Sequence, residues 1–197
     1  MADYNAIKYD GFSKGSTTLI KTLTASSSAT LSFVDGTSDV VLDSTYKEYL
    51  FIFNNIHPAS DGVGFLFQGN AAGGSGYDET ITSTYFRSYH DEGDTETEFS
   101  YSAGHDQANG TAFQYLIDYL GNDNDQSTSG YLHIFNPSST TFIKHFMARL
   151  NEITENNYTA ERNSAGYFNT TSAIDEIQFK MSSGNIDAGT IQLIGIT

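Results

Sequence analysis

Apolar and polar residues alternate with a period of two along most of the chain. This pattern is typical of β-strands, in which successive side chains point to opposite faces of a sheet. Two short segments, 115–120 and 152–158, could form helices instead of strands, but the first is rich in aromatic residues, which are poor helix formers. Ten segments favour strands, and loops rich in Gly, Ser, Asn and Asp separate them: 19–23, 29–33, 46–56, 62–68, 81–90, 113–119, 131–135, 141–150, 175–181 and 189–197. The spacing predicts an all-β protein, an antiparallel, jelly-roll-like β-sandwich of about ten strands.

Two of these segments carry additional information. The segment 46–56 (YKEYLFIFNNI) is apolar at most consecutive positions, which predicts a central strand covered on both faces. The segments 131–135 and 141–150 flank Asn136 and Pro137, and proline suits the second position of a tight turn. We therefore expect a β-hairpin there.

The first sixteen residues alternate poorly and contain two glycines. They nevertheless carry four large apolar side chains that belong to no predicted strand: Tyr4, Ile7, Tyr9 and Phe12. We expect residues 1–16 to form an N-terminal arm that docks outside its own domain, and residues 17–197 to form a single sandwich domain.

Charge and composition narrow the classes of partner. The chain has 24 acidic and 9 basic residues among 197, a net charge of −15, which argues against binding to nucleic acid or anionic membranes. It has no cysteine, so disulfides and thiolate metal sites are excluded. The polar, acidic start does not resemble a signal peptide, and we expect no membrane insertion because no apolar run approaches about 20 residues.

Candidate metal ligands are scattered. Two acidic runs, 91–98 and 122–125, could hold calcium, but the glycine and terminal glutamate of an EF-hand loop are missing, so solvated loops are favoured. His133 and His145 lie on the two strands of the expected hairpin and could form half of a metal site, although polar strand positions usually face solvent. We expect neither a metal nor a cofactor.

Catalytic signatures are weak. The segment 73–76 (GGSG) is not a nucleophile elbow, because Tyr77 stands where a second glycine is needed. A glycosidase needs two carboxylates across a groove, and four acids in or near the strands could pair: Glu48, Asp118, Glu152 and Glu161. A chain with 24 acids offers such pairs by chance. We expect no catalytic residues and no enzyme, with a jelly-roll glycosidase or lyase as the alternative.

Tyr85, Arg87 and Tyr89 share one face of the strand predicted at 81–90. Two aromatic rings with a guanidinium between them suit stacking on sugars or packing against a protein. The alternative is that the rings belong to the core and Arg87 lies at its rim. The three residues, together with the four apolar residues of the arm, are the candidate interaction surface.

The order of the segments resembles a known family. The chain runs from Leu31-Ser32-Phe33 through 46–52 (YKEYLFI), 65–70 (FLFQGN) and 83–87 (STYFR), and closes on 177–179 (IQF) and 189–196 (GTIQLIGI). This resembles small structural proteins of phages of marine bacteria, which typically end in a G-T-x-x-L-Y-G-I-like strand; Ile194 stands where that family often has tyrosine.

The resemblance implies a virion component used as a capsid decoration, tail fibre or adhesin. It supplies no functional residues. We therefore expect a non-enzymatic bacteriophage structural protein on the virion surface, which forms a homo-oligomer and contacts other virion proteins. The alternative is a carbohydrate-binding, lectin-like adhesin that recognises host-surface glycans.

Overall fold

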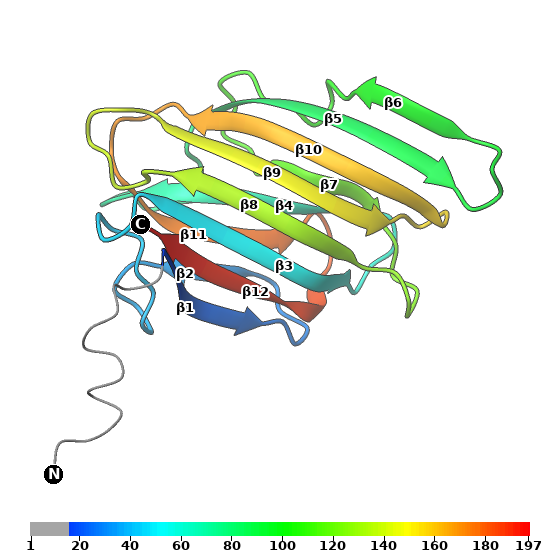
Figure 1. The fold of residues 1–197 in the computed structure, drawn as a ribbon, viewed down its shortest axis with the longest axis horizontal. Helices are drawn as coiled ribbons and strands as arrows, with labels where there is room; N and C mark the ends of the chain where they lie inside the picture. Colours follow the sequence, from blue (N-terminus) through cyan, green and yellow to red (C-terminus); the bar gives the residue numbers. More distant parts are fainter. Residues whose placement is uncertain (1–15) are drawn as a thin grey trace, which may run out of the picture.

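The computed structural model describes residues 16–197, which form twelve antiparallel strands in two packed sheets (Figure 1). The larger sheet has the order β1 (Thr17–Thr24), β12 (Ile186–Ile196), β3 (Glu48–Pro58), β8 (Thr128–Phe135), β9 (Lys144–Ile153), β10 (Tyr158–Phe168), β5 (Ile81–Asp91) and β6 (Thr97–Tyr101). The smaller sheet has the order β2 (Leu31–Val34), β11 (Ile174–Met181), β4 (Val63–Ala71) and β7 (Gln114–Leu120). The predicted all-β sandwich is confirmed.

The connectivity is that of a jelly roll with two inserted hairpins. The eight strands that make up the jelly roll occupy the two sheets in the orders β1-β12-β3-β8 and β2-β11-β4-β7. The hairpins β5–β6 and β9–β10 then extend the larger sheet beyond β8. Because the smaller sheet has no matching strands in the described chain, β5 and β6 project past β7 (Figure 1).

The prediction of about ten strands missed β6 and β10. The inward positions of β10 include Ala160, Arg162 and Ser164, which are all buried. These side chains are small or charged, so the strand lacks the alternating large hydrophobic residues by which the other strands were predicted. The segment 152–158, considered as a helix, contains the end of β9 and the turn before β10. Strand β6 lies partly in the acidic run that was read as a loop.

A cluster of phenylalanine rings fills the space between the sheets. Phe179 of β11 lies at its centre, with ring centroids 5.3–6.5 Å from those of five others: Phe33, Phe51, Phe53, Phe65 and Phe67. All six side chains are buried, and several pairs meet edge to face, the arrangement that aromatic quadrupoles prefer.

Strand β4, rather than β3, is covered on both faces. Almost all of its residues are buried, because loops pack over the outer face of the smaller sheet. The Gln68 side chain holds these loops by donating hydrogen bonds to the carbonyl oxygens of Glu79, Thr111 and Ala112 at 3.0–3.3 Å.

The prediction that the segment 46–56 is covered on both faces was wrong. Strand β3 is central in the larger sheet, but the outward side chains of Leu50 and Ile52 are only half-buried. Apolar residues on both faces of this strand therefore indicate burial on one face and an open apolar surface on the other.

The predicted hairpin is confirmed by the pairing of β8 with β9. Its register places His133 opposite Met147, so His133 and His145 are not directly paired. The expected arm lies almost entirely outside the described residues, and with it Tyr4, Ile7, Tyr9 and Phe12. In residues 16–197 no helix is long and apolar enough to cross a membrane.

Candidate binding surfaces

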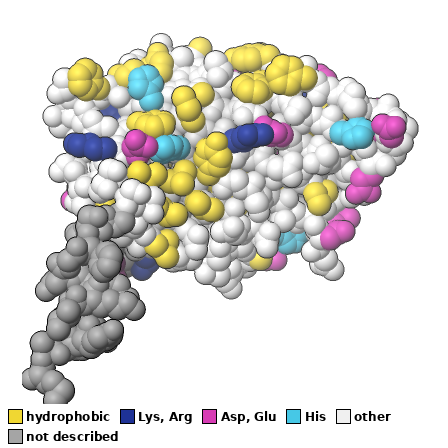
Figure 2. Space-filling view, viewed as in Figure 1, with side chains coloured by type: hydrophobic (Ala, Val, Ile, Leu, Met, Phe, Trp, Pro, Cys, Tyr) yellow, Lys and Arg dark blue, Asp and Glu magenta, His cyan; other side chains and the backbone are white. Residues whose placement is uncertain are grey.

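The outer face of the larger sheet, here called the outer sheet face, is unusually apolar for a solvent-facing surface. Each strand contributes its outward positions, and apolar side chains gather over the upper and left parts of the face in Figure 2. Those that are exposed or half-buried are Leu19, Leu50, Ile52, Phe86, Phe99, Tyr101, Tyr131, Phe135, Met147, Tyr167, Ile194 and Ile196. Large apolar patches of this kind mark interaction sites on soluble proteins.

Two carboxylates on the strands of this face lie beside basic side chains. Glu48 lies 2.9 Å from the His133 ring, and Glu161 accepts two hydrogen bonds from the Arg149 guanidinium at 2.7 and 3.1 Å. Further acidic side chains gather at one end of the molecule, on the right in Figure 2. The outer sheet face is therefore nearly neutral within a strongly acidic protein.

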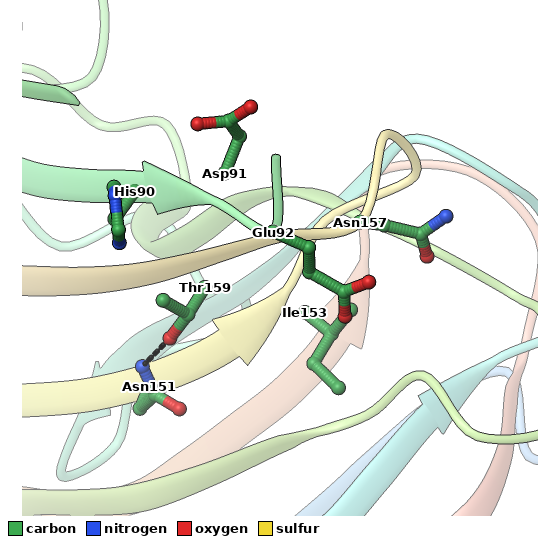
Figure 3. A pocket seen from close by; sticks show the side chains of 7 residues that line it. All are labelled: His90, Asp91, Glu92, Asn151, Ile153, Asn157 and Thr159. Carbon is green, nitrogen blue, oxygen red and sulfur yellow. Dashed lines mark hydrogen bonds between the residues drawn. The ribbon is translucent and has the colours of Figure 1, made fainter. Parts of the chain in front are cut away.

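A broad hollow of about 590 Å³ lies where β5 and β9 end and β10 begins (Figure 3). Its side chains spread around the rim, and the polar ones mostly bond to neighbours: Asn151 donates to Thr159 at 3.0 Å, and Asp91 accepts from the backbone of Thr95 and Glu96. A hydrogen bond of 2.6 Å from the Thr95 hydroxyl group, together with those from the Glu96 and Thr95 backbone amides, lowers the pKa of Asp91 to about 2. The polar side chains of this hollow therefore stabilise a turn and the neighbouring strands rather than form a reactive centre.

A cluster of charged side chains is buried between the sheets beside the phenylalanine core. Arg162 of β10 donates from Nε to Glu152 of β9 at 2.7 Å, and its Nη2 lies 2.8 Å from Asp118 of β7. Tyr85 donates to Asp118 at 3.4 Å, and His105 lies 3.5 Å from the same carboxylate. Arg162 thus joins strands of both sheets.

Burial dominates the protonation of this cluster. It raises the pKa of Glu152 to about 8 despite the lowering effect of Arg162, which favours the neutral form of this carboxyl group. Burial likewise raises the pKa of Tyr85 well above its usual value and lowers the pKa of His105. Arg162 and Asp118 therefore form the principal ion pair.

A pocket of about 250 Å³ opens beside this cluster, where β5 and β10 project past β7. We call it the tyrosine pocket. Its lining consists of Arg87, Tyr89, Tyr119, Thr154, Glu155, Asn156, Tyr158 and Arg162. The Tyr89 and Tyr158 rings stack with centroids 5.5 Å apart and planes 20° apart, and the Arg87 guanidinium lies 5.6 Å from the Tyr89 ring.

The backbone fixes the wall contributed by β7. Tyr119 has a φ of 59°, in the left-handed region that side chains other than glycine seldom adopt. Its carbonyl oxygen accepts a hydrogen bond of 3.0 Å from the Glu155 backbone amide, which joins the end of β7 to the β9–β10 turn. The Tyr119 ring remains 47% exposed beside the pocket.

The structure separates the residues that the sequence singled out. Tyr85 is fully buried against Asp118, whereas Arg87 and Tyr89 line the tyrosine pocket. Among the four candidate carboxylates, Asp118 and Glu152 meet on Arg162 in the interior, while Glu48 and Glu161 belong to the outer sheet face. Within residues 16–197 no three His, Asp or Glu side chains gather as a metal site.

Sequence reasoning missed Arg162, Tyr119 and Tyr158. The signal for Arg162 was a single basic residue with small residues two positions before and after it, on the same face of the strand. This pattern predicts a solvent-exposed arginine as readily as a buried one. The two tyrosines are far apart in sequence and meet only through the pairing of β7 with the β9–β10 turn.

Comparisons with known proteins add no family to the fold class that the structure shows. No protein-family model, curated protein or solved structure matches the chain. The strand order defines a jelly-roll β-sandwich with an enlarged sheet.

Proposed function

We propose that this chain is a non-enzymatic structural protein that assembles with further copies of itself through the outer sheet face, as part of a phage virion surface. The observation that supports this proposal is the apolar outer side of β3, where Leu50 and Ile52 are half-buried in the middle of an eight-stranded sheet. Packing a second sheet over such a face at about 10 Å is the ordinary way to bury it.

Charge favours a second copy as the partner. With a net charge of −15, free copies repel one another over most of their surface. Two outer sheet faces can approach at a lower cost than other surfaces, because the carboxylates Glu48 and Glu161 lie beside His133 and Arg149. Self-association through one shared patch also matches the symmetry of most homo-oligomers.

The virion setting comes from the resemblance of the segment order and of the final strand to phage structural proteins. Capsid decorations, tail fibres and adhesins all present several copies of one chain, so self-association fits each of them. A non-catalytic role accords with the interior position of Asp118 and Glu152, which bond to Arg162 rather than facing each other across a groove.

Sedimentation equilibrium tests the proposal. We expect a mass above that of one chain, and tighter association when sodium chloride rises from about 0.05 M to about 0.5 M, because salt screens the repulsion between acidic copies. Replacing Met147, which is 56% exposed at the centre of the face, by glutamine should weaken association at least about fivefold. Phe142→Gln is the control, since Phe142 is 69% exposed in the β8–β9 turn and should leave association unchanged.

Three results would contradict the proposal. A monomer at all concentrations and salt levels would remove self-association. Dissociation by EDTA at constant ionic strength would show that a metal holds the copies together. Equal effects of Met147→Gln and Phe142→Gln would place the contact elsewhere.

A further inference from the structure

We propose that the tyrosine pocket binds a single neutral sugar ring, a role independent of self-association through the outer sheet face. The pocket is partly enclosed by strands of both sheets and by the β9–β10 turn. Its volume of about 250 Å³ lies just below the range of about 300–1,000 Å³ for sites that hold drug-sized molecules, so it suits one small ring.

The unused donor of Arg162 indicates a polar ligand. Arg162 is 2% exposed, and its Nε and Nη2 are committed to Glu152 and Asp118. Its Nη1 is buried with no hydrogen-bond partner among residues 16–197, as are Asp118 Oδ2 and Glu152 Oε2 of the same cluster, and the Arg162 side chain lines the pocket. A buried guanidinium nitrogen without a partner costs about 1–3 kcal/mol or more. Because Nη1 has no accessible surface in the structure, a ligand oxygen gains this hydrogen bond only if the Arg162 side chain shifts towards the pocket.

The walls of the pocket select a sugar among oxygen-bearing molecules. The rings of Tyr89, Tyr119 and Tyr158 line the pocket and offer aromatic surface against which the C–H face of a pyranose can pack, with one face each of Tyr89 and Tyr158 taken up by their mutual stacking. The amide of Asn156 both donates and accepts hydrogen bonds, as a sugar hydroxyl does. Apolar surface combined with a few convergent polar groups is the usual composition of small-molecule sites.

The charges around the pocket favour a neutral sugar over an acidic one. Arg162 is paired with Asp118 and Glu152, and Arg87 lies 3.6 Å from Glu98 and 3.8 Å from Asp118. Glu155 adds a negative charge to the lining, and the whole chain carries −15. A carboxylate on the ligand would therefore meet net repulsion.

Titrations followed by ¹⁵N–¹H NMR test this inference, with glucose, galactose, mannose and N-acetylglucosamine as neutral probes and glucuronate as the acidic one. We expect at least one neutral sugar to bind, with a dissociation constant of about 1 mM, and to shift the Arg162 side-chain resonances. Tyr119→Asn should weaken binding about tenfold, because asparagine tolerates the left-handed backbone but removes the ring.

Phe142→Asn is the matched control and should bind as the wild type does, since it removes an exposed ring outside the pocket. If Tyr119→Asn does not fold, Asn156→Ala in the exposed turn replaces it, with an expected weakening of about fivefold. The inference is overturned if no neutral sugar binds, if glucuronate binds more tightly than all of them, or if shifts occur without weakening in the folded pocket variant. Sedimentation of the same samples reports self-association separately.

Discussion

Replacing Arg162 by leucine is expected to lower the free energy of unfolding by about 3–5 kcal/mol. The substitution leaves Asp118 buried without its closest cation and removes the hydrogen bond to Glu152. Isolated charges in a protein interior are costly, because the protein replaces little of the hydration that they lose. Urea unfolding followed by circular dichroism measures the loss as a lower midpoint with an unchanged slope.

Arg149→Leu is the matched control. Arg149 also pairs with a glutamate on a neighbouring strand, Glu161, but both side chains are substantially exposed. An exposed pair contributes about 0–1 kcal/mol, so this variant should remain close to the wild type. Similar losses in the two arginine variants would show that the Arg162 cluster does not hold the sheets together.

Replacing Phe179 by alanine is expected to cost about 3–5 kcal/mol of stability. Phe179 packs against five other phenylalanine rings, so its removal leaves a cavity that no single neighbour can fill. Thermal unfolding should show a markedly lower melting temperature, with the β-rich circular dichroism spectrum retained below it.

Phe142→Ala removes the same ring from an exposed turn and should change stability by no more than about 0.5 kcal/mol. A loss for Phe179→Ala as small as that for Phe142→Ala would mean that the phenylalanine cluster is not the core of the fold.

The alternation of apolar residues was enough to predict the sandwich, because most strands bury one apolar face. Strand β9 shows the pattern clearly, with Phe146, Ala148 and Leu150 inward and Met147 and Arg149 outward. The hairpin between β8 and β9 followed from its Asn-Pro turn.

The same reasoning failed where electrostatic interactions replace apolar packing. Strand β10 has Arg162 and Ser164 at inward positions, and the periodicity of hydrophobic residues does not register such positions. The tyrosine pocket could not be assembled from sequence either. Arg87 and Tyr89 were identified as candidates, but their partners Tyr119 and Tyr158 reach the site through long-range strand pairing.

The two apolar faces of β3 carried information that sequence alone could not interpret. An apolar residue at an outward position predicts burial, but it does not say whether the chain itself or a partner provides the cover. Loops of this chain cover the outer side of the smaller sheet at β4, whereas Leu50 and Ile52 of β3 stay half-buried. The outer sheet face is thus the surface for which we propose a second copy.

Protection of a single engineered cysteine tests this claim most directly, because the chain has no cysteine of its own. Thr84→Cys places a thiol on the outer sheet face, and Ser183→Cys places one in the exposed turn after β11. As the protein concentration rises through the dissociation constant, we expect the reaction of the thiol at position 84 with a maleimide to slow at least about tenfold, while that at position 183 keeps its rate. Equal rates at every concentration, or protection of position 183 alone, would contradict assembly through the outer sheet face.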